Sequence, residues 1–511
     1  MTHPARVEAR VLVVGGGPVG MMLAAELAAR GTAVAVVEHR TTTSERPKAT
    51  TLHARTVQTL ARRGLLPGAA HGADGHGPGA APGPGGMPFH FAGITGLTLT
   101  APPGEPVPIL KMPQAGLERF LEARARAAGA RVLRGLELTG LVTEADGVRA
   151  EASGPEGTTV LRARYAVGAD GARSTVRRLA GIESDTWPAT VTALMGQVRT
   201  ERAGALAPGW HRTPRGWLVA KDGPDGTTHL RTLACDGPVS GAPADRGRPP
   251  TVEEIGREAS YIAGYDIALT DARWLSRFSD FTRLARTYRS GPVFLAGDAA
   301  HVHFPVGGQG LSTGLLDAAN LGWKLALAAA GDAGDPLLDT YDAERRPAAR
   351  RVIDNTRAQV ALMRPDPSLD PLRDLFTDLF ASGRGDDCFG PMISAQETVL
   401  PDMSPSSCEG TFLGNVPLDT EDGPTDVIRL LREGRPLLLV AGDEGMRHTG
   451  PARPYAGRLR VVRCEPAPGL PGEALLVRPD GYIGWAAGGG KLGDVLDRYF
   501  GRGTGPAGEP R

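Results

Sequence analysis

Three glycines near the N-terminus have the spacing of a turn that binds a dinucleotide. The segment GGGPVG places Gly15, Gly17 and Gly20 after the apolar run at 11–14, and Glu38 ends the next apolar run about 20 residues further on. Such glycines allow a tight turn and a close approach of the backbone to a pyrophosphate, while the acid can bind a ribose hydroxyl. The spacing therefore predicts a dinucleotide site; the alternative is a glycine-rich turn in another α/β fold.

A second acid, Asp298, follows an apolar run and precedes a loop that is poor in side chains. In VFLAGDAAHVHFPVGGQG, residues 293–310, the loop extends from Pro305 to Gly310, where a helical pattern begins. A carboxylate at a strand tip can accept hydrogen bonds from ligand hydroxyls, and a helix N-terminus favours an electron-rich group. The same residues also fit an ordinary strand–turn–helix connection in which Asp298 is a cap.

A third acid ends another apolar run, in the segment GADGARS at 168–174. Asp170 repeats the pattern of an acid at a strand tip, with Gly171 next to it and Arg173 and Arg177 nearby. By itself the segment is equally compatible with a turn that the aspartate side chain caps.

Rigid elements must position these residues, and the hydrophobic pattern indicates where they lie. Residues 7–40 have the pattern of strand, helix and strand, which is a right-handed βαβ unit. Other elements are expected from the pattern: a helix at 114–129, strands at 131–168, an antiparallel sheet at 185–290, helices at 310–362, irregular chain at 364–410, and a small α/β unit from about 411. The chain is therefore expected to be an α/β protein with several domains.

Composition argues against several classes of function. Lys+Arg and Asp+Glu both total 57, so the formal net charge of zero gives no support for nucleic-acid or membrane-surface binding. The four cysteines form no CxxC pair, which argues against dithiol chemistry and a zinc site, and no metal is expected. No apolar run is long enough to span a bilayer and no signal peptide is visible, so a cytoplasmic location is expected.

Taken together and in this order, the three motifs resemble the single-component FAD-dependent aromatic hydroxylases. The likeness covers about residues 7–350 and includes GGGPVG, ADGARSTVR, FLAGDAAHVHFPVGGQG and DAANLGWKLA. The segment LLVRPDGYIGWAA resembles the C-terminal thioredoxin-like domain of the phenol hydroxylase branch, and the absence of CxxC implies that this domain is structural. HARTVQTLARRGLL and the tail are most similar to hydroxylases of polycyclic aromatic polyketides.

The resemblance implies an α/β fold with three parts. A Rossmann-type FAD-binding domain would comprise residues 1–184 and 286–362, and an antiparallel-sheet substrate domain would comprise 185–285. A linker at 363–410 would lead to a thioredoxin-like domain at 411–511.

The resemblance also implies contacts between individual residues and FAD. The expected contacts are Gly15, Gly17, Val19 and Gly20 at the pyrophosphate, Glu38 at the adenosine ribose, Gln114 at FAD, the Leu138 backbone at the adenine, Asp298 at the ribityl chain, and Gly310 and Leu311 at the N1–C2=O edge. Asp170 and Arg173 belong to a motif linked with both FAD and NADPH. Lys48 replaces an arginine of many relatives, Leu311-Ser312 replace Met-Asn, and Leu316 replaces a glutamine.

The activity that the resemblance implies is hydroxylation of an aromatic ring. NADPH would reduce the flavin, O2 would add at flavin C4a to give a hydroperoxide, and a phenol carbon would attack its distal oxygen. Candidate pocket residues are Phe304 and Pro305, with Trp210, Trp217, Phe278 and Phe281 as further aromatic candidates and His211, His229, His301 and His303 as candidate bases.

Two other outcomes stay open. One is Baeyer–Villiger insertion of oxygen beside a ketone of a similar polyketide, and the other is a non-catalytic flavoprotein that sequesters an aromatic antibiotic. The expected partners are an aromatic small molecule, NAD(P)H and O2, and a homodimer is compatible with the sequence.

Overall fold

A central sheet is assembled from distant parts of the sequence. The computed structural model describes residues 5–44, 48–66, 86–202, 204, 206–223, 226–235, 249–401 and 408–501. The strand order of this sheet is β20 (Arg289–Ser290), β21 (Val293–Leu295), β12 (Tyr165–Gly168), β2 (Val11–Val14), β3 (Val34–Glu38) and β8 (Arg131–Arg134). All neighbours are parallel except β20 and β21. Consequently the carboxyl ends of β2, β3, β12 and β21 meet at one edge, and each of the three motif acids follows one of these ends.

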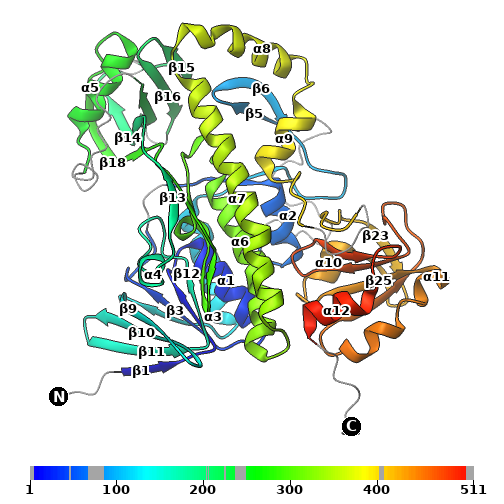
Figure 1. Cartoon of the computed structure of the whole chain (residues 1–511). Helices are drawn as coiled ribbons and strands as arrows, with labels where there is room; N and C mark the ends of the chain where they lie inside the picture. Colours follow the sequence, from blue (N-terminus) through cyan, green and yellow to red (C-terminus); the bar gives the residue numbers. More distant parts are fainter. Residues whose placement is uncertain are drawn as a thin grey trace.

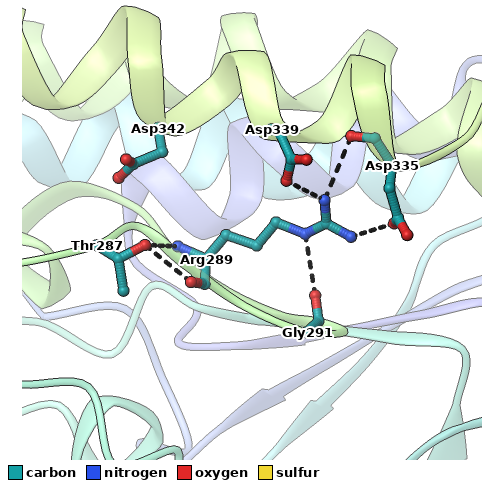
Figure 2. Close-up of a pocket in the computed structure, with 6 residues that line it drawn as sticks. All are labelled: Thr287, Arg289, Gly291, Asp335, Asp339 and Asp342. Carbon is teal, nitrogen blue, oxygen red and sulfur yellow. Dashed lines mark hydrogen bonds and ion pairs between the residues drawn. The ribbon is translucent and has the colours of Figure 1, made fainter.

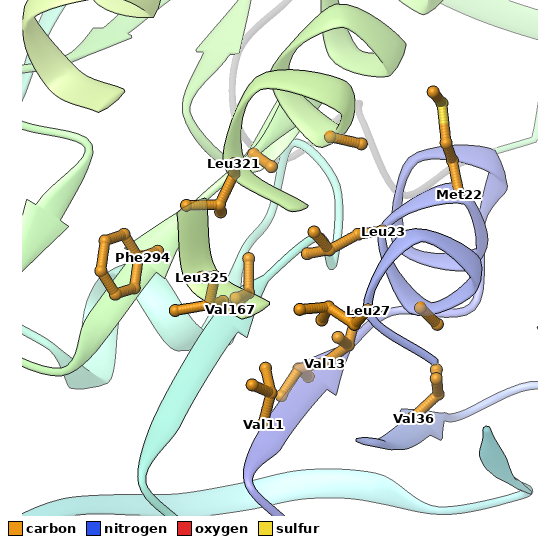
Figure 3. Packing of buried hydrophobic residues seen from close by; sticks show 14 of the residues in the cluster. Val11, Val13, Met22, Leu23, Leu27, Val36, Val167, Phe294, Leu321 and Leu325 are labelled. Carbon is orange, nitrogen blue, oxygen red and sulfur yellow. The ribbon is translucent and has the colours of Figure 1, made fainter. Parts of the chain in front are cut away.

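Helices α1 (Pro18–Ala28) and α6 (Gly310–Ala330) pack together over the central sheet. Figure 3 shows Leu23 and Leu27 of α1 meeting Leu321 and Leu325 of α6 above Val167 of β12. Burying each such leucine contributes roughly 1.5–3 kcal/mol, so this contact fixes the two helix N-termini relative to the strand ends. The predicted βαβ unit is confirmed, with α1 beginning earlier than predicted, since a proline suits the first helical turn.

Smaller sheets and helices extend the central sheet on both sides (Figure 1). One sheet has the order β1 (Ala5–Glu8), β11 (Gly157–Ala163), β10 (Gly147–Gly154) and β9 (Glu137–Glu144), and another has β13 (Ser184–Trp187), β19 (Thr282–Ala285) and β22 (His301–Val302). Two-stranded pairs are β4 (Thr51–His53) with β7 (Ile109–Lys111), and β5 (Met87–Phe91) with β6 (Ile94–Leu99). The remaining helices of this part are α2 (Ala54–Arg62), α3 (Gln114–Ala127) and α4 (Thr175–Leu179).

The predicted antiparallel sheet is present, but it is accompanied by a helix that the sequence pattern did not reveal. The strand order is β15 (Gly209–Thr213), β16 (Gly216–Asp222), β17 (Thr228–Ala234), β14 (Thr192–Thr200) and β18 (Leu269–Ser279). Helix α5 (Val252–Ala263) covers one face of this sheet through Ile255, Ala259 and Ile262. The helix has a Thr251 cap, two acids in its first turn and a left-handed Gly264 at its end, so local signals for it existed.

Irregular chain was predicted at 364–410, but the described residues of this stretch include two helices. After the long helix α7 (Asp335–Met363) the chain forms α8 (Asp370–Ala381) and α9 (Asp386–Ser394), and both helices pack on β6. Phe380 of α8 and Phe389 of α9 pack edge to face with ring centroids 5.4 Å apart, which ties the two helices together.

The C-terminal part is a mixed sheet with flanking helices, in agreement with the predicted thioredoxin-like fold. Its order is β24 (Gly423–Asp426), β23 (Pro417–Thr420), β26 (Arg460–Cys464), β25 (Leu437–Ala441), β27 (Ala474–Val477) and β28 (Ile483–Ala486), with α10 (Val427–Leu431), α11 (Gly442–Met446) and α12 (Leu492–Phe500). Within the described residues, none of the helices has the length and apolar character needed to cross a membrane.

Candidate cofactor and substrate site

Of the three spaced glycines at the turn between β2 and α1, two are tightly packed and one is open. A Cβ atom on Gly15 would lie 2.3 Å from the Ala169 carbonyl oxygen, and one on Gly20 would lie 1.9 Å from the Gly15 oxygen. Gly15 also has a φ of +111°, which favours glycine. A Cβ atom on Gly17 would meet none of the described atoms within 4 Å. Gly15 and Gly20 therefore serve packing, whereas Gly17 leaves room for a ligand to approach the backbone.

The first turn of α1 has the properties of an anion site. No side chain caps the helix and no acid lies in its first turn. Its free N–H groups and the positive end of the helix dipole therefore suit a pyrophosphate. Val19 in this turn packs against Gly297 and Gly314, where Cβ atoms would lie 3.1 and 2.7 Å from its Cγ2. This contact joins the first motif to the third.

Glu38 ends β3, and its carboxylate lies beside the glycine-rich turn. Its Oε2 accepts a 2.6 Å hydrogen bond from the Gly16 N–H, and its Oε1 accepts one of 2.9 Å from the Arg40 N–H. The buried carboxylate is thus fixed, with lone pairs left for a ribose hydroxyl. The Leu138 side chain belongs to the hydrophobic core, so any contact with adenine would come from its backbone.

Asp170 has the capping role that its sequence left as an alternative. Its Oδ2 accepts hydrogen bonds from the N–H groups of Thr175 and Val176, at 2.7 and 3.1 Å, where α4 begins. Its Oδ1 is buried and has no partner among the described residues. One oxygen therefore caps a helix, while the other is left to accept a hydrogen bond from a ligand. The Arg173 side chain is exposed.

A buried carboxylate, Asp317 of α6, holds the turn that contains Asp298. Its Oδ2 accepts a 3.0 Å hydrogen bond from the Gly297 N–H and lies 2.7 Å from His301 Nε2. Its Oδ1 accepts a 2.8 Å hydrogen bond from Arg345 Nε. Burial opposes ionisation of Asp317, but His301 and Arg345 together lower its pKa. His301 is therefore engaged in positioning the turn.

The Asp298 side chain is exposed and lies close to two other predicted residues. Surrounding protein raises the pKa of its carboxyl through desolvation, and the charges of His301 and Lys48 partly oppose this. Lys48 therefore lies within electrostatic range of Asp298. The Gln114 N–H at the start of α3 donates to the Ala49 carbonyl, 3.0 Å away, next to Lys48. Residues from three separate segments thus meet at this point.

The loop before α6 presents backbone to the same region. Gly307 and Gly308 have φ values of +75° and +65°. Helix α6 begins at Gly310 without a side-chain cap and without an acid in its first turn. The N–H groups of Gly310 and Leu311 therefore lie at the positive end of a 21-residue helix.

Two neutral histidines support this loop. His53 Nε2 lies 2.8 Å from the Gly307 carbonyl oxygen, which can only accept, so Nε2 carries the proton. Burial lowers the pKa of both His53 and His303 to about 4. His303 Nε2 is buried without a described partner and would lie 3.4 Å from a Cβ atom on Gly310. Ser312, which replaces the usual asparagine, accepts a 3.1 Å hydrogen bond from the His53 N–H.

Aromatic residues of the antiparallel sheet lie against the start of this loop. Phe304 is buried, and its ring centroid lies 5.5 Å from that of Phe278 in β18. Trp217 is buried and donates from Nε1 to a carbonyl at the end of α7, whereas Trp210 is half-buried, 6.0 Å from Trp217 between ring centroids. Pro305 is exposed. Phe304 and Trp217 belong to one buried cluster, and the half-buried Phe278 packs against it.

The other candidates from the sequence have different neighbours. His211 Nε2 lies 2.6 Å from the Ala207 carbonyl oxygen, and the Phe281 ring lies 5.2 Å from the Arg283 guanidinium. His229 lies on the antiparallel sheet, 6.3 Å from Trp274 between ring centroids. None of these contacts involves the loop before α6.

Three buried residues that shape the site were not predicted from the sequence. Asp317 was part of the motif DAANLGWKLA without a role, and Arg345 and His53 had none. A signal existed for Asp317, because a carboxylate inside an otherwise apolar helix face needs a buried partner. Its partners could not be identified, since they come from β22 and α7.

A surface hollow near β20 does not belong to this site. Figure 2 shows its lining residues, Thr287, Arg289, Gly291, Asp335, Asp339 and Asp342. Arg289 binds the carboxylates of Asp335 and Asp339 and the Gly291 carbonyl, so its guanidinium is occupied by the protein itself. No group of side chains suited to a metal ion occurs among the described residues.

Comparison with known proteins identifies the family. Residues 8–356 match the family model of an FAD binding domain, and residues 406–503 match that of the C-terminal part of aromatic-ring hydroxylases. The chain belongs to the FAD-dependent aromatic hydroxylases. This hydroxylase is therefore a flavoprotein monooxygenase whose cofactor is FAD, as the sequence predicted.

Relatives of the hydroxylase cover nearly its whole length. A 12-dehydrotetracycline 5-monooxygenase/anhydrotetracycline 6-monooxygenase of Streptomyces rimosus is 37% identical over 510 residues, 96% of this chain and 98% of the relative. The solved anhydrotetracycline hydroxylase from Streptomyces rimosus has a TM-score of 0.87 at 35% identity, covering 98% of this chain and 100% of that one. A dialkyldecalin synthase of Streptomyces rugosporus is 35% identical over 499 residues, 96% of this chain and 98% of the relative.

Proposed function

We propose that this hydroxylase adds one oxygen atom from O2 to a polycyclic aromatic polyketide, with NADPH as the electron donor. The observation that carries the proposal is the meeting of two uncapped helix N-termini, those of α1 and α6, with the carboxylates of Glu38 and Asp298. The sheet that adjoins the α6 loop supplies aromatic residues, which suits a flat, apolar substrate.

The residues present fit FAD along its length. The open Gly17 and the first turn of α1 would bind the pyrophosphate, Glu38 a ribose hydroxyl, and Asp298 the ribityl hydroxyls. The N–H groups of Gly310 and Leu311 would stabilise negative charge at the N1–C2=O edge of the reduced ring. When bound, FAD supplies hydride acceptance from NADPH and activation of O2.

The polypeptide contributes an apolar wall beside the loop before α6. Phe304 and Phe278 exclude water there, which limits loss of activated oxygen. His53 and His303 are neutral at physiological pH because burial lowers their pKa to about 4. They therefore hold the loop without placing positive charge next to an electrophilic oxygen.

The test is turnover by the purified yellow protein. We expect anhydrotetracycline, the substrate named for a relative, or another polyphenolic polycycle to accelerate NADPH consumption and to give a product heavier by one oxygen. NADH in place of NADPH tests the choice of nicotinamide. A lactone product would instead indicate Baeyer–Villiger insertion, and an isomer of the substrate formed without NADPH would indicate cyclisation. Bound FAD with no consumption for any aromatic would indicate sequestration and contradict the proposal.

We also propose the division into domains, a cytoplasmic location and a homodimeric assembly. Strands β14 to β18 lie inside the proposed substrate domain, 185–285, while its first boundary falls within β13. Limited proteolysis tests the boundaries, and sedimentation tests the assembly, where a single monomeric species at micromolar concentration would contradict the homodimer.

A further inference from the structure

The two faces of the antiparallel sheet have different partners. In β17, Leu230 and Thr232 point toward α5, because Leu230 belongs to the cluster with Ile255 and Thr232 contacts the Glu258 carboxylate. Alternation along a strand then places Arg231 on the opposite face. In β16 the buried Leu218 and Ala220 likewise face α5. Figure 1 shows α5 on the outer side of this sheet and α7 on its inner side.

Two cations share this inner face. Arg231 pairs with Val219, and Lys221 of β16 pairs with His229, so Arg231 and Lys221 are diagonal neighbours across β16 and β17. Diagonal neighbours lie about 7–8 Å apart, within reach of long side chains. Trp210 also pairs with Val219, so it shares the row of Arg231.

A third cation comes from the side of the cofactor loop. Lys111 of β7 donates from Nζ to Thr51 Oγ1 at 2.9 Å. A Cβ atom on Gly308 would lie 3.6 Å from Thr51 Cβ, so Lys111 is one residue removed from the loop before α6. We call Lys111, Lys221 and Arg231 the basic cluster.

The charges of the basic cluster lie close enough to act on one another. Burial lowers the pKa of Lys111, and the charges of Lys221 and Arg231 lower it further. Burial also lowers the pKa of His90 to about 4, with contributions from Arg231 and Lys111. The His90 ring lies 4.5 Å from the Trp210 ring between centroids, which places it beside the same face.

No carboxylate of the described residues neutralises the basic cluster. Among the described residues, the side chains of Lys221 and Arg231 form no ion pair or hydrogen bond, and the only described bond of Lys111 Nζ is to a neutral hydroxyl. The three side chains of the basic cluster are exposed, whereas the buried Arg62 and Arg345 pair with Glu105 and Asp317. Gathering like charges without counter-charges is unfavourable, so an arrangement of this kind suits an anionic ligand.

We propose that the basic cluster binds an ionised phenol or enol oxygen of the substrate, with Arg231 as the main contact. This inference rests on the proposed function and specifies the substrate as one that binds as an oxyanion. The phenolic proton would pass to solvent water on binding. The resulting phenolate has a more electron-rich ring, which is the form that attacks an electrophilic oxygen. Arg231 is thus a specificity-determining residue, and no protein base is needed to ionise the substrate.

The experiment uses three matched tricyclic probes with the FAD-loaded protein. They are 2-hydroxyanthraquinone, which absorbs at longer wavelength when ionised, 2-methoxyanthraquinone, which cannot ionise, and anthraquinone-2-carboxylate. Binding is followed by absorbance below the solution pKa of the phenol. We expect the wild-type protein to bind the phenol with the spectrum of its anion.

The decisive comparison is between Arg231→Met, Arg231→Lys and the control Arg257→Met, an exposed arginine of α5 on the far side of the sheet. Arg231→Met should bind the phenol at least about tenfold more weakly and without the anion spectrum, since a charge-assisted hydrogen bond is lost. Arg231→Lys should retain the anion spectrum, Lys111→Met should weaken it, and the control should match the wild type. The methyl ether, 2-methoxyanthraquinone, should bind equally well to Arg231→Met and to the wild type.

Three results would overturn the inference. In the first, the wild-type protein binds the phenol only in its neutral form. In the second, Arg231→Met and the wild type bind the phenol equally. In the third, Arg231→Met weakens the binding of anthraquinone-2-carboxylate but not that of the phenol. The proposed function is judged separately, by NADPH consumption and product mass of the wild-type protein. If turnover is absent while the anion spectrum depends on Arg231, the function fails and the binding site stands. If turnover is normal but the anion spectrum does not depend on Arg231, the proposed function stands and the proposed binding site fails.

Discussion

Asp298 shows how a single side chain can be both accessible and fixed. Its own carboxylate is exposed, while the turn beneath it is held by the hydrogen bond from Gly297 to the buried Asp317. A ligand hydroxyl can therefore reach a carboxylate whose position does not need to be ordered on binding, which lowers the entropic cost of binding.

The substitution Asp298→Ala should weaken FAD binding roughly ten- to hundred-fold, because hydrogen bonds to a charged group are lost. The ratio of flavin to protein absorbance after gel filtration measures the occupancy. Asp354→Ala, at an exposed helix position paired with Arg350, is the control and should keep its flavin. Full flavin occupancy in Asp298→Ala would show that Asp298 is wrongly placed at the ribityl chain.

His53 should make the hydroxylase sensitive to acid. Its folded-state pKa of about 4 lies below the ordinary 6.5, so the unfolded chain takes up a proton first and stability falls as pH decreases between these values. From about pH 7 to about pH 5 this single group should account for roughly 2 kcal/mol. His53→Gln keeps an N–H donor for Gly307 but cannot titrate. Urea unfolding at the two pH values should show a smaller loss for the variant, and equal losses would contradict the role of His53.

The sequence was most informative where one residue type satisfies a local requirement. Gly15 is required by its positive φ, Gly20 by its contact with the Gly15 oxygen, and Asp298 follows a strand, so all three were predicted from the pattern. The partners of Asp317 come from segments 16 and 28 residues away along the chain, and no local pattern specifies them. Asp170 was ambiguous, and the structure gives it both a capping oxygen and a free oxygen.

At the scale of the element, the N-terminus of helix α1 combines a structural task at Gly20 and a binding task at Gly17. Gly20→Ala should destabilise the protein by about 1–3 kcal/mol, because its Cβ would lie 1.9 Å from the Gly15 oxygen and force α1 away from the turn. Gly17→Ala meets no such contact among the described atoms and should fold normally but retain less FAD. Thermal unfolding of the flavin-free proteins and flavin content separate the two effects.

The two glycine variants thus test the packing of helix α1 as well as the binding of FAD. Equal melting temperatures for the flavin-free Gly20→Ala and wild-type proteins would contradict the packing argument. Undiminished flavin in Gly17→Ala would contradict the assignment of the open glycine to the pyrophosphate.

Elements with continuous or strictly periodic apolar residues were predicted well, and others were not. The fully buried β2, β3 and β12 are apolar except for the terminal Glu38 of β3, and they were found at their observed places. Helix α8 was missed although Leu372, Phe376 and Leu379 recur with helical spacing, because the surrounding prolines and aspartates indicate loops. Its place beside β5 and β6 depends on tertiary packing of Phe376 and Phe380 against Phe91 of β5.

At the scale of the whole molecule, a buried ion network joins the C-terminal part to helices α6 and α7. Arg478 donates to both oxygens of Glu344 at 2.8 and 2.7 Å and to both oxygens of Asp480 at 3.0 and 2.6 Å. Lys324 of α6 donates to Glu344 at 2.7 Å. Burial opposes ionisation of Glu344, but Arg478 and Lys324 together lower its pKa strongly. The thioredoxin-like part therefore supports, through α6, the helix whose N-terminus faces the cofactor.

The substitution Arg478→Met should test this support, since methionine preserves the buried apolar volume and removes the charge. Glu344 would then keep its ion pair with Lys324, while Asp480 would lose its only described ion pair, and breaking a buried pair in this way costs about 3–5 kcal/mol. Arg463→Met is the matched control, because Arg463 pairs with the exposed Glu421 and such a pair contributes at most about 1 kcal/mol. We expect the melting temperature and the flavin content of Arg478→Met to fall together, because loosening α6 disturbs its N-terminus. A lower melting temperature with full flavin content would mean that the network attaches the C-terminal part but does not support the cofactor site. An unchanged melting temperature would contradict any stabilising role.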